Sequence, residues 1–336
     1  MRMSTAKFFL PVFLLLACPL FGGLDKAEDA LPKVYEHHPE DQLSLGFWET
    51  YSWADKYYKA GISLNSSLKI TKDRPKLHAA LAFLGLEEVL VAAVYEEGGN
   101  QPHYLHDASV RCGTSPEAYS ALLSGNADII FCFEPSDAQL KQARELGVSY
   151  KLTPLGKDAF VFFVNKQNPV RNLSSKQIQD IYSGKITNWR LVGGRDAAIR
   201  AFQRPKNSGS QTILEKVMNG IPLITPPTEN YHVSMWDIIE AAANYRNAEN
   251  ALGYSFLYYA SAMVRNEQIK LLSFDGIAPT RENIQNETYP FTETFYAITI
   301  EGRETENTKK LLQWLSSAEG QKLVELSGYT SYKPAE

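Results

Sequence analysis

The stretch VRCGTSPEAYSALLSGNADIIF, residues Val110–Phe131, decides the fold class. Its opening VRC predicts a short strand. Ser115 is a good N-cap and Pro116 suits the first helical position, so a helix is expected to begin there and to end at Gly125. The continuous apolar run ADIIFCF then predicts a buried strand. A strand, a helix and a second strand in this order indicate an α/β unit.

The alternation continues through the rest of the chain. We predict helices for DAQLKQARELG, for LSSKQIQDIYSG with Ser174 and Gln177 spaced as a capping box, for TILEKVMNG and for WDIIEAAANYR. Strands are predicted for AFVFFVN, AAIRAF, ALGYSFLYY, IKLLSF and TFYAITI. LHAALAFLGLEEVLVAAVYEE is expected to form one helix, and TKKLLQWLSSAEGQKLVELSG one long terminal helix. The pattern predicts an α/β architecture with mainly parallel sheets.

Length and charge limit the classes of function. The 336 residues exceed what one core usually organises, so two compact domains are expected. The formal net charge is −4 and no basic stripe is present, which argues against a nucleic-acid partner. A bound anion would therefore be held by local geometry and not by the overall field.

The N-terminus carries a targeting pattern. Arg2 and Lys7 precede the apolar run Phe8–Ala17, which is too short to span a bilayer and is typical of a signal peptide, assigned to residues 1–17. The sequence LLAC, ending at Cys18, resembles a bacterial lipobox, which implies cleavage before this cysteine and a lipid on its thiol. An ordinary secretory signal cut nearby is the alternative. Both place the mature chain outside the cytoplasm, and residues 18–66 are expected to form a tether and an extension.

The remaining cysteines and the histidines give little support for metal chemistry. Cys112 and Cys132 end two apolar runs that we take for neighbouring strands, so a disulfide and two buried free thiols are both open. No CxxC or Cys/His spacing is present, and the six histidines are scattered. We therefore expect neither a metal nor another cofactor.

RPKNSGSQT, residues Arg204–Thr212, has the composition of an anion cradle. A helix N-terminus exposes unpaired N–H groups and a partial positive charge, so a Ser/Gly-rich loop leading into it can wrap an oxyanion. Ser208 and Ser210 offer hydroxyls, Gly209 permits close approach, and Arg204 offers a bidentate fork. The alternative is a capped helix after a surface turn.

Two more helix starts follow strands directly. One contains Thr114 and Ser115, and the other contains Ser136 and Asp137. Each alone is more simply an N-cap. Together with the Arg204 loop they fit a ligand held at the carboxyl ends of strands between two lobes.

These stretches lead to a family resemblance. VRCGTSPEAYSALLSGNADIIF, AFVFFVNKQNPV, LSSKQIQDIYSGKITNW, RPKNSGSQT and GYSFLYYA resemble the phosphate-binding components of bacterial ABC transporters, including the DING-type relatives, from about residue 67 to the end. The resemblance implies a two-lobed periplasmic-binding-protein type II fold in which AFVFFVN and TFYAITI are crossing hinge strands. Lobe one would comprise residues 67–160 and 291–336, and lobe two residues 161–290.

The resemblance also implies a set of ligand-binding residues, namely Arg204, Ser208, Gly209, Ser210, Thr114, Ser115, Ser136 and Asp137. The match at Ser136 and Asp137 is looser because the loop before them is longer here. Asp137 is our candidate for accepting the proton of phosphate, which would exclude sulfate, an anion without a proton to offer.

One position departs from the family. Relatives carry a ligand-binding hydroxyl, a glycine and an aspartate where this chain has Leu81, Ala79 and His78. Losing one charge-assisted hydrogen bond costs about 1.5–3 kcal/mol. Either Leu81 fills core and the other loops hold the anion, or the ligand has changed or the site has been lost.

The sequence therefore predicts a monomeric extracytoplasmic binding protein, anchored to the membrane through Cys18, that captures inorganic phosphate or another small oxyanion for an ABC permease. An enzyme is not expected because no G-x-S-x-G is present and no histidine lies in a motif with a serine. The alternative is a diverged surface protein that interacts or signals with an altered or lost anion site.

Overall fold

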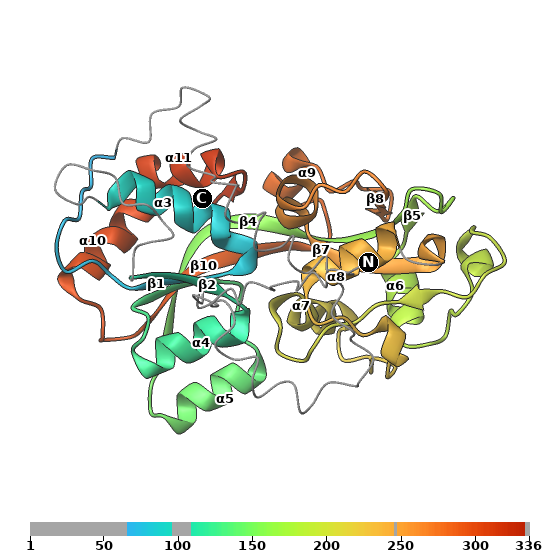
Figure 1. Cartoon of the computed structure of the whole chain (residues 1–336), viewed down its shortest axis with the longest axis horizontal. Coiled ribbons are helices and arrows are strands. Elements are labelled where there is room, and N and C mark those ends of the chain that lie inside the picture. Colours follow the sequence, from blue (N-terminus) through green and yellow to red (C-terminus); the bar gives the residue numbers. More distant parts are fainter. Residues whose placement is uncertain (1–65, 96–108, 245–246, 333–336) are drawn as a thin grey trace, which may run out of the picture. The chain divides into compact units, whose positions relative to one another are not determined.

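The computed structural model describes residues 66–95, 109–244 and 247–332, all of which belong to one compact unit (Figure 1). The predicted signal peptide, Cys18 and the extension up to residue 65 lie outside these ranges. Within them, no helix combines the length and the apolar character that a membrane span requires.

The described elements alternate between strands and helices. The strands are β1 (Leu77–Ala80), β2 (Val110–Gly113), β3 (Ile129–Cys132), β4 (Tyr150–Asn165), β5 (Asn172–Leu173), β6 (Arg200–Ala201), β7 (Ala251–Phe256), β8 (Ile269–Leu271), β9 (Ser273–Phe274), β10 (Thr292–Ile300) and β11 (Thr330–Ser331). The α-helices are α3 (Leu84–Val94), α4 (Ser115–Ser124), α5 (Asp137–Glu145), α6 (Ser175–Tyr182), α7 (Gly209–Met218), α8 (Met235–Ala243), α9 (Arg281–Gln285), α10 (Glu306–Leu315) and α11 (Ala318–Leu326).

The main sheet is mixed, so the prediction of mainly parallel sheets was wrong. Its strand order is β2-β1-β3-β10-β4-β7-β6, with β8 and β11 also paired to β4. β1 pairs in parallel with β2 and β3, and β6 pairs in parallel with β7. The long strands β4 and β10 run antiparallel to their neighbours. Hydrophobic periodicity indicates that a segment is a strand. Whether that strand runs parallel or antiparallel to its neighbour is set by the path of the chain.

Strand β4 joins the two lobes and can be followed in Figure 1. Residues 150–159 pair with β10, which also pairs with β3, whereas residues 160–163 pair with β7. Its second half is AFVFFVN, and all of those side chains are buried. The first lobe thus contains β1, β2 and β3, and the second contains β6 and β7. The residue boundaries given above for the lobes stay a prediction.

The predicted helix LHAALAFLGLEEVLVAAVYEE was wrong in its first part. Leu77–Ala80 form β1, the short 3₁₀ turn η4 covers Leu81–Phe83, and the α-helix begins only at Leu84. All four residues of β1 are buried between β2 and β3. A continuously apolar run fits a fully buried strand and a buried helix equally well, so periodicity alone could not separate the two.

The predicted single terminal helix is two helices. α10 ends at Leu315 and α11 begins at Ala318, with Ser317 as N-cap accepting a hydrogen bond from the N–H of Gly320. A Cβ at Gly320 would lie 2.2 Å from the carbonyl oxygen of Trp314, so the backbone approaches too closely for a side chain. The sequence SSAEG thus contains a cap and a close backbone contact, and both separate the two helices.

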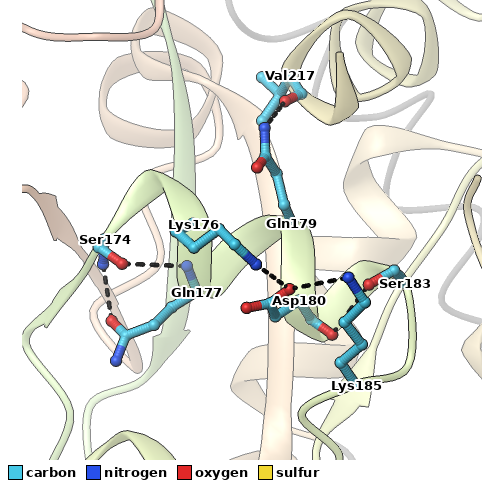
Figure 2. Close-up of polar contacts among 8 residues, drawn as sticks. All are labelled: Ser174, Lys176, Gln177, Gln179, Asp180, Ser183, Lys185 and Val217. Atoms are coloured by element: carbon cyan, nitrogen blue, oxygen red, sulfur yellow. Dashed lines mark hydrogen bonds and ion pairs between the residues drawn. The ribbon is translucent and has the colours of Figure 1, made fainter. Parts of the chain in front are cut away.

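Capping predictions were confirmed for α6 and shifted by one residue for α4. Figure 2 shows Ser174 Oγ accepting from the Gln177 N–H at 3.0 Å, while Gln177 Oε1 accepts from the Ser174 N–H at 2.8 Å. In α4 the N-cap is Thr114, whose capping box uses Glu117, and Ser115 is the first helical residue. Thr114 is the N-cap in place of Ser115 because Glu117 stands three residues after Thr114, as a capping box requires.

Cys112 and Cys132 are both buried and are not joined by a disulfide. Our expectation that they sit on neighbouring strands was wrong, because β1 lies between β2 and β3. Two sheet spacings amount to roughly 9.5 Å, well beyond the Cα separation that a disulfide spans. Burial raises the pKa of the Cys132 thiol well above its ordinary value.

Candidate anion-binding site

The N-terminus of α7 is left open by its own sequence. Ser208 occupies the N-cap position, but its side chain makes no capping hydrogen bond, and its buried Oγ has no partner. Asn207 before it adopts a left-handed φ of 67°, which turns the chain into the helix. The first N–H groups of any helix lack intrahelical acceptors. The Ser208 hydroxyl and these N–H groups are therefore available to a ligand.

Arg204 is buried beside this helix start with 8% of its surface exposed. Its Nη1 donates to Ser210 Oγ at 2.8 Å and its Nη2 donates to the Val233 carbonyl oxygen at 2.8 Å, while Nε is buried without a partner. Burial lowers the pKa of Arg204, and the charge of Asp237 acts in the opposite direction. Among the described residues the guanidinium is hydrogen-bonded only to uncharged oxygen atoms.

Gln211 fixes the loop that carries Arg204. Its Oε1 accepts from the Arg204 backbone N–H at 2.9 Å and from the Tyr254 hydroxyl at 2.5 Å. The side chains of Gln211 and Tyr254 are both buried. The arginine is thus held in place by a hydrogen-bonded core and does not rely on a ligand for its position.

The first lobe contributes the start of α4. Ser115 is half-buried, and a Cβ built on Gly209 would lie only 2.7 Å from its Oγ. The structure therefore brings two predicted ligand residues from different lobes together. Thr114 is exposed and used otherwise, because its N–H and its hydroxyl both donate to Glu117 Oε2, at 2.6 and 2.9 Å.

The start of α5 reaches the same loop. The Ser136 hydroxyl donates to Asn207 Oδ1 at 3.3 Å, across the two lobes. Asp137 is exposed, and among the described residues no hydrogen bond or ion pair joins it to the site. Its charge still reaches α7, because it helps to raise the pKa of Glu215, for which burial is the main cause. The structure thus places Ser136 at the site and Asp137 at its exposed edge.

The segment in which this chain departs from the resembling family, His78–Leu81, covers most of β1 and the first residue of η4. Leu81 is the first residue of η4 and is only partly buried, so it does not simply fill core. His78 is buried, neither ring nitrogen has a partner, and burial lowers its pKa to about 4. It is therefore neutral in neutral solution and adds no positive charge there.

Sequence reasoning missed two supporting residues, Asn207 and Gln211. Asn207 could have been found, because asparagine is the side chain that most readily adopts a left-handed turn before a helix. Gln211 gave no usable pattern, since its partners, Arg204 and Tyr254, are set by tertiary packing.

Other features of the surface do not compete with this site. A pocket of about 210 Å³ is lined by none of the predicted residues; it is formed by Ala260, Ser261, Arg265, Asn266, Glu267, Ile269 and Leu271. The described ranges hold no group of three His, Cys, Asp or Glu side chains placed to bind a metal ion.

The arrangement is that of a two-lobed protein in which helix starts of both lobes lie side by side, Ser115 next to Gly209 and Ser136 next to Asn207. A family model described as PBP superfamily domain matches residues 85–319, and the chain belongs to this family.

The similar proteins agree on the fold. The phosphate-binding protein PstS of Bacillus subtilis is 26% identical over 278 residues, covering 80% of this chain and 86% of the relative. PstS of Borreliella burgdorferi is 24% identical over 195 residues, covering 56% and 68%. Among solved structures, a putative phosphate ABC transporter substrate-binding protein with bound phosphate from Clostridium perfringens matches with a TM-score of 0.60, 22% identity and coverage of 76% and 99%. A phosphate transport receptor from Vibrio cholerae matches with a TM-score of 0.56, 23% identity and the same coverage.

Proposed function

We propose that the protein captures inorganic phosphate and delivers it to an ABC permease. The observation that carries the proposal is Arg204, a buried guanidinium hydrogen-bonded to uncharged atoms only, next to the open helix start at Ser208. A buried charge whose hydrogen bonds go to uncharged atoms is costly, and a bound anion would add to the partial compensation that the charge of Asp237 gives Arg204. The relatives named as phosphate-binding proteins support phosphate as that anion.

Each group at the site would have a separate role. Arg204 and the α7 N–H groups would bind two phosphate oxygens, Ser208 would donate its hydroxyl, and Ser115 would complete the shell from the first lobe. Gly209 would let the backbone come close. Asp137 would accept the phosphate proton after the lobes adjust around the ligand, which would reject sulfate through an unpaired, repelling contact.

The remaining parts of the proposal concern the place of action. The mature chain would be attached outside the cytoplasm by lipid on Cys18 and would act as a monomer. Binding between two lobes would select a closed form that the permease recognises. The protein would thus act by binding and release, without catalysis.

A second candidate function is favoured by Leu81. An apolar side chain at the end of β1, where the resembling family has a hydroxyl, removes one donor from the first lobe. A protein that kept the fold for a surface interaction, with an altered or lost anion site, would tolerate this change.

Calorimetric titration with phosphate and then sulfate decides between them, using refolded protein stripped of any bound anion. We expect micromolar or tighter phosphate binding, no heat with sulfate, and at least a roughly 100-fold loss in Arg204→Met. Arg190→Met is the matched control, because this exposed arginine pairs with Asp196 away from the site. Folded protein that gives no heat with either anion would favour the second function.

A further inference from the structure

One cluster of charged side chains links the two lobes without belonging to the anion site. Lys216 lies on α7, two helical turns beyond Gly209. Its Nζ is 2.7 Å from Glu293 Oε2 on β10 and 3.8 Å from Glu134 Oε2, in the loop between β3 and α5. The Tyr296 hydroxyl of β10 donates to Glu134 Oε1 at 3.2 Å. The cluster therefore joins a helix of the second lobe, a loop of the first lobe and a hinge strand.

The two ends of the cluster differ in burial. The Glu293 side chain is 11% exposed, whereas the Lys216 side chain is 55% exposed. Burial raises the pKa of Glu293 despite the nearby ammonium, while the pKa of Lys216 is also raised, its desolvation being outweighed by Glu293 and Glu134. Glu293 is the buried partner, so its ionised form depends on the lysine more than the lysine depends on it.

An apolar contact accompanies the ion pairs. Phe133, which follows β3, stacks on Phe256 at the end of β7 with ring centroids 4.1 Å apart and an interplanar angle of 19°. The stacked rings bury apolar surface between the lobes, and the lysine adds ion pairs with carboxylates from two elements. Among the described residues, no hydrogen bond or ion pair joins the side chains of Lys216 or Phe133 to the Arg204 loop, so the cluster can act on closure without contacting a ligand.

We propose that Lys216 is a positioning residue that latches the two lobes together through Glu134 and Glu293 and so favours the closed, ligand-retaining form. The proposal rests on the proposed function for its effect on affinity, but its effect on lobe closure is independent of which ligand is bound. The apparent affinity of a ligand that binds only the closed form is proportional to the fraction of molecules that are closed. Losing the latch lowers that fraction and so weakens binding without touching the ligand.

The test compares Lys216→Met with Lys176→Met. Lys176 is a matched control, because it is a similarly exposed lysine that pairs with Asp180 inside α6 and links no lobes (Figure 2). Small-angle X-ray scattering of the ligand-free proteins should show a larger radius of gyration for Lys216→Met and no change for Lys176→Met. Phosphate titration should show a three- to tenfold weaker Kd for Lys216→Met only.

Two further variants separate a latch from a local structural role. Glu134→Gln should reproduce the expansion, and the double variant Lys216→Met/Glu134→Gln should add little to either single one. Lys216→Arg should restore compactness and affinity. If Lys216→Met matches Lys176→Met in both measurements, the latch is wrong. If no variant and not even the wild type binds phosphate while Lys216→Met still expands, the latch stands and the proposed function fails.

Discussion

The helices α6 and α7 begin with similar sequences but use them differently. In α6, Ser174 and Gln177 satisfy each other in a closed capping box. In α7, Ser208 stands at the same position with a buried, unpartnered hydroxyl and no capping bond. The lack of a partner residue does not explain this, because Gln211 stands three residues after Ser208, as Gln177 does after Ser174. Its side chain instead holds the Arg204 N–H and the Tyr254 hydroxyl.

The difference shows how a helix start can be left without its side-chain cap. Capping boxes occupy the starts of α4, α5, α6 and α8. At α7 the residue that would close the box is withdrawn into the core, which leaves donors free next to a buried guanidinium. A helix start that satisfies itself contributes stability, and one that does not can contribute binding.

The largest expected effect is on the pH dependence of stability. It arises from two buried histidines, His78 near Glu117 of α4 and His232 near Arg204. Burial lowers the pKa of each to about 4. The unfolded state binds more protons between pH 6.5 and 4, so the free energy of unfolding should fall as the pH falls through that window, by roughly 3 kcal/mol per histidine.

Urea unfolding between pH 4 and 6.5 measures this effect. His78→Gln and His232→Gln should each flatten the pH dependence, and the two changes should add. Phosphate should also raise the pKa of His232 in proton NMR spectra, because the anion would offset the Arg204 charge, which lowers that pKa. If the free energy of unfolding depended on pH in both variants as it does in the wild type, these histidines would not be the cause of the stability loss.

The next effect uses the close approach of the two lobes. Gly209→Ala places a methyl group where Ser115 Oγ lies 2.7 Å away. We expect phosphate affinity to fall about 100-fold, because the methyl group would push Ser115 away from the start of α7, while the helix itself gains from alanine. Ser175→Ala is the control at the same position of α6. Titration calorimetry and thermal unfolding measured together distinguish lost binding from lost folding.

A smaller effect tests the comparison of the two caps directly. Ser174→Ala should lower the free energy of unfolding by about 1 kcal/mol and leave phosphate affinity unchanged. Ser208→Ala should do the reverse, weakening phosphate binding roughly five- to tenfold with little effect on stability. Urea unfolding and calorimetry on the same two proteins check both halves. Equal stability losses in the two variants would mean that Ser208 is an ordinary cap.

The smallest effect is expected for Lys176→Met in α6. Its ion pair with Asp180 spans one helical turn on the surface, as Figure 2 shows. Exposed pairs of this kind contribute little, so urea unfolding should detect only a slight fall in the denaturation midpoint at low salt and a smaller one at high salt. A loss of stability as large as that of Ser174→Ala would show that α6 relies on this pair more than a capped helix should.

The comparison with the structure shows where sequence reasoning succeeded. It identified most helices and strands, because capping residues and glycines such as Gly125, with a φ of 73°, act within a few residues of each other. It failed at Leu77–Ala80 and in the terminal helix, where a continuous apolar run and an unnoticed cap left the local pattern undecided. It also placed Cys112 and Cys132 on adjacent strands, although strand order is not encoded locally.

The sequence by itself determined the α/β alternation and the resemblance to phosphate-binding proteins, and it indicated Arg204–Thr212 as a candidate anion cradle. These depend on short-range features such as turn chemistry, caps and motif spacing. Only the tertiary structure decided that Gln211 leaves Ser208 uncapped, that Ser115 meets Gly209 and that Lys216 joins two lobes. Those outcomes depend on which distant residues the mixed sheet brings together. Short-range sequence periodicity does not specify the path of the chain through two lobes.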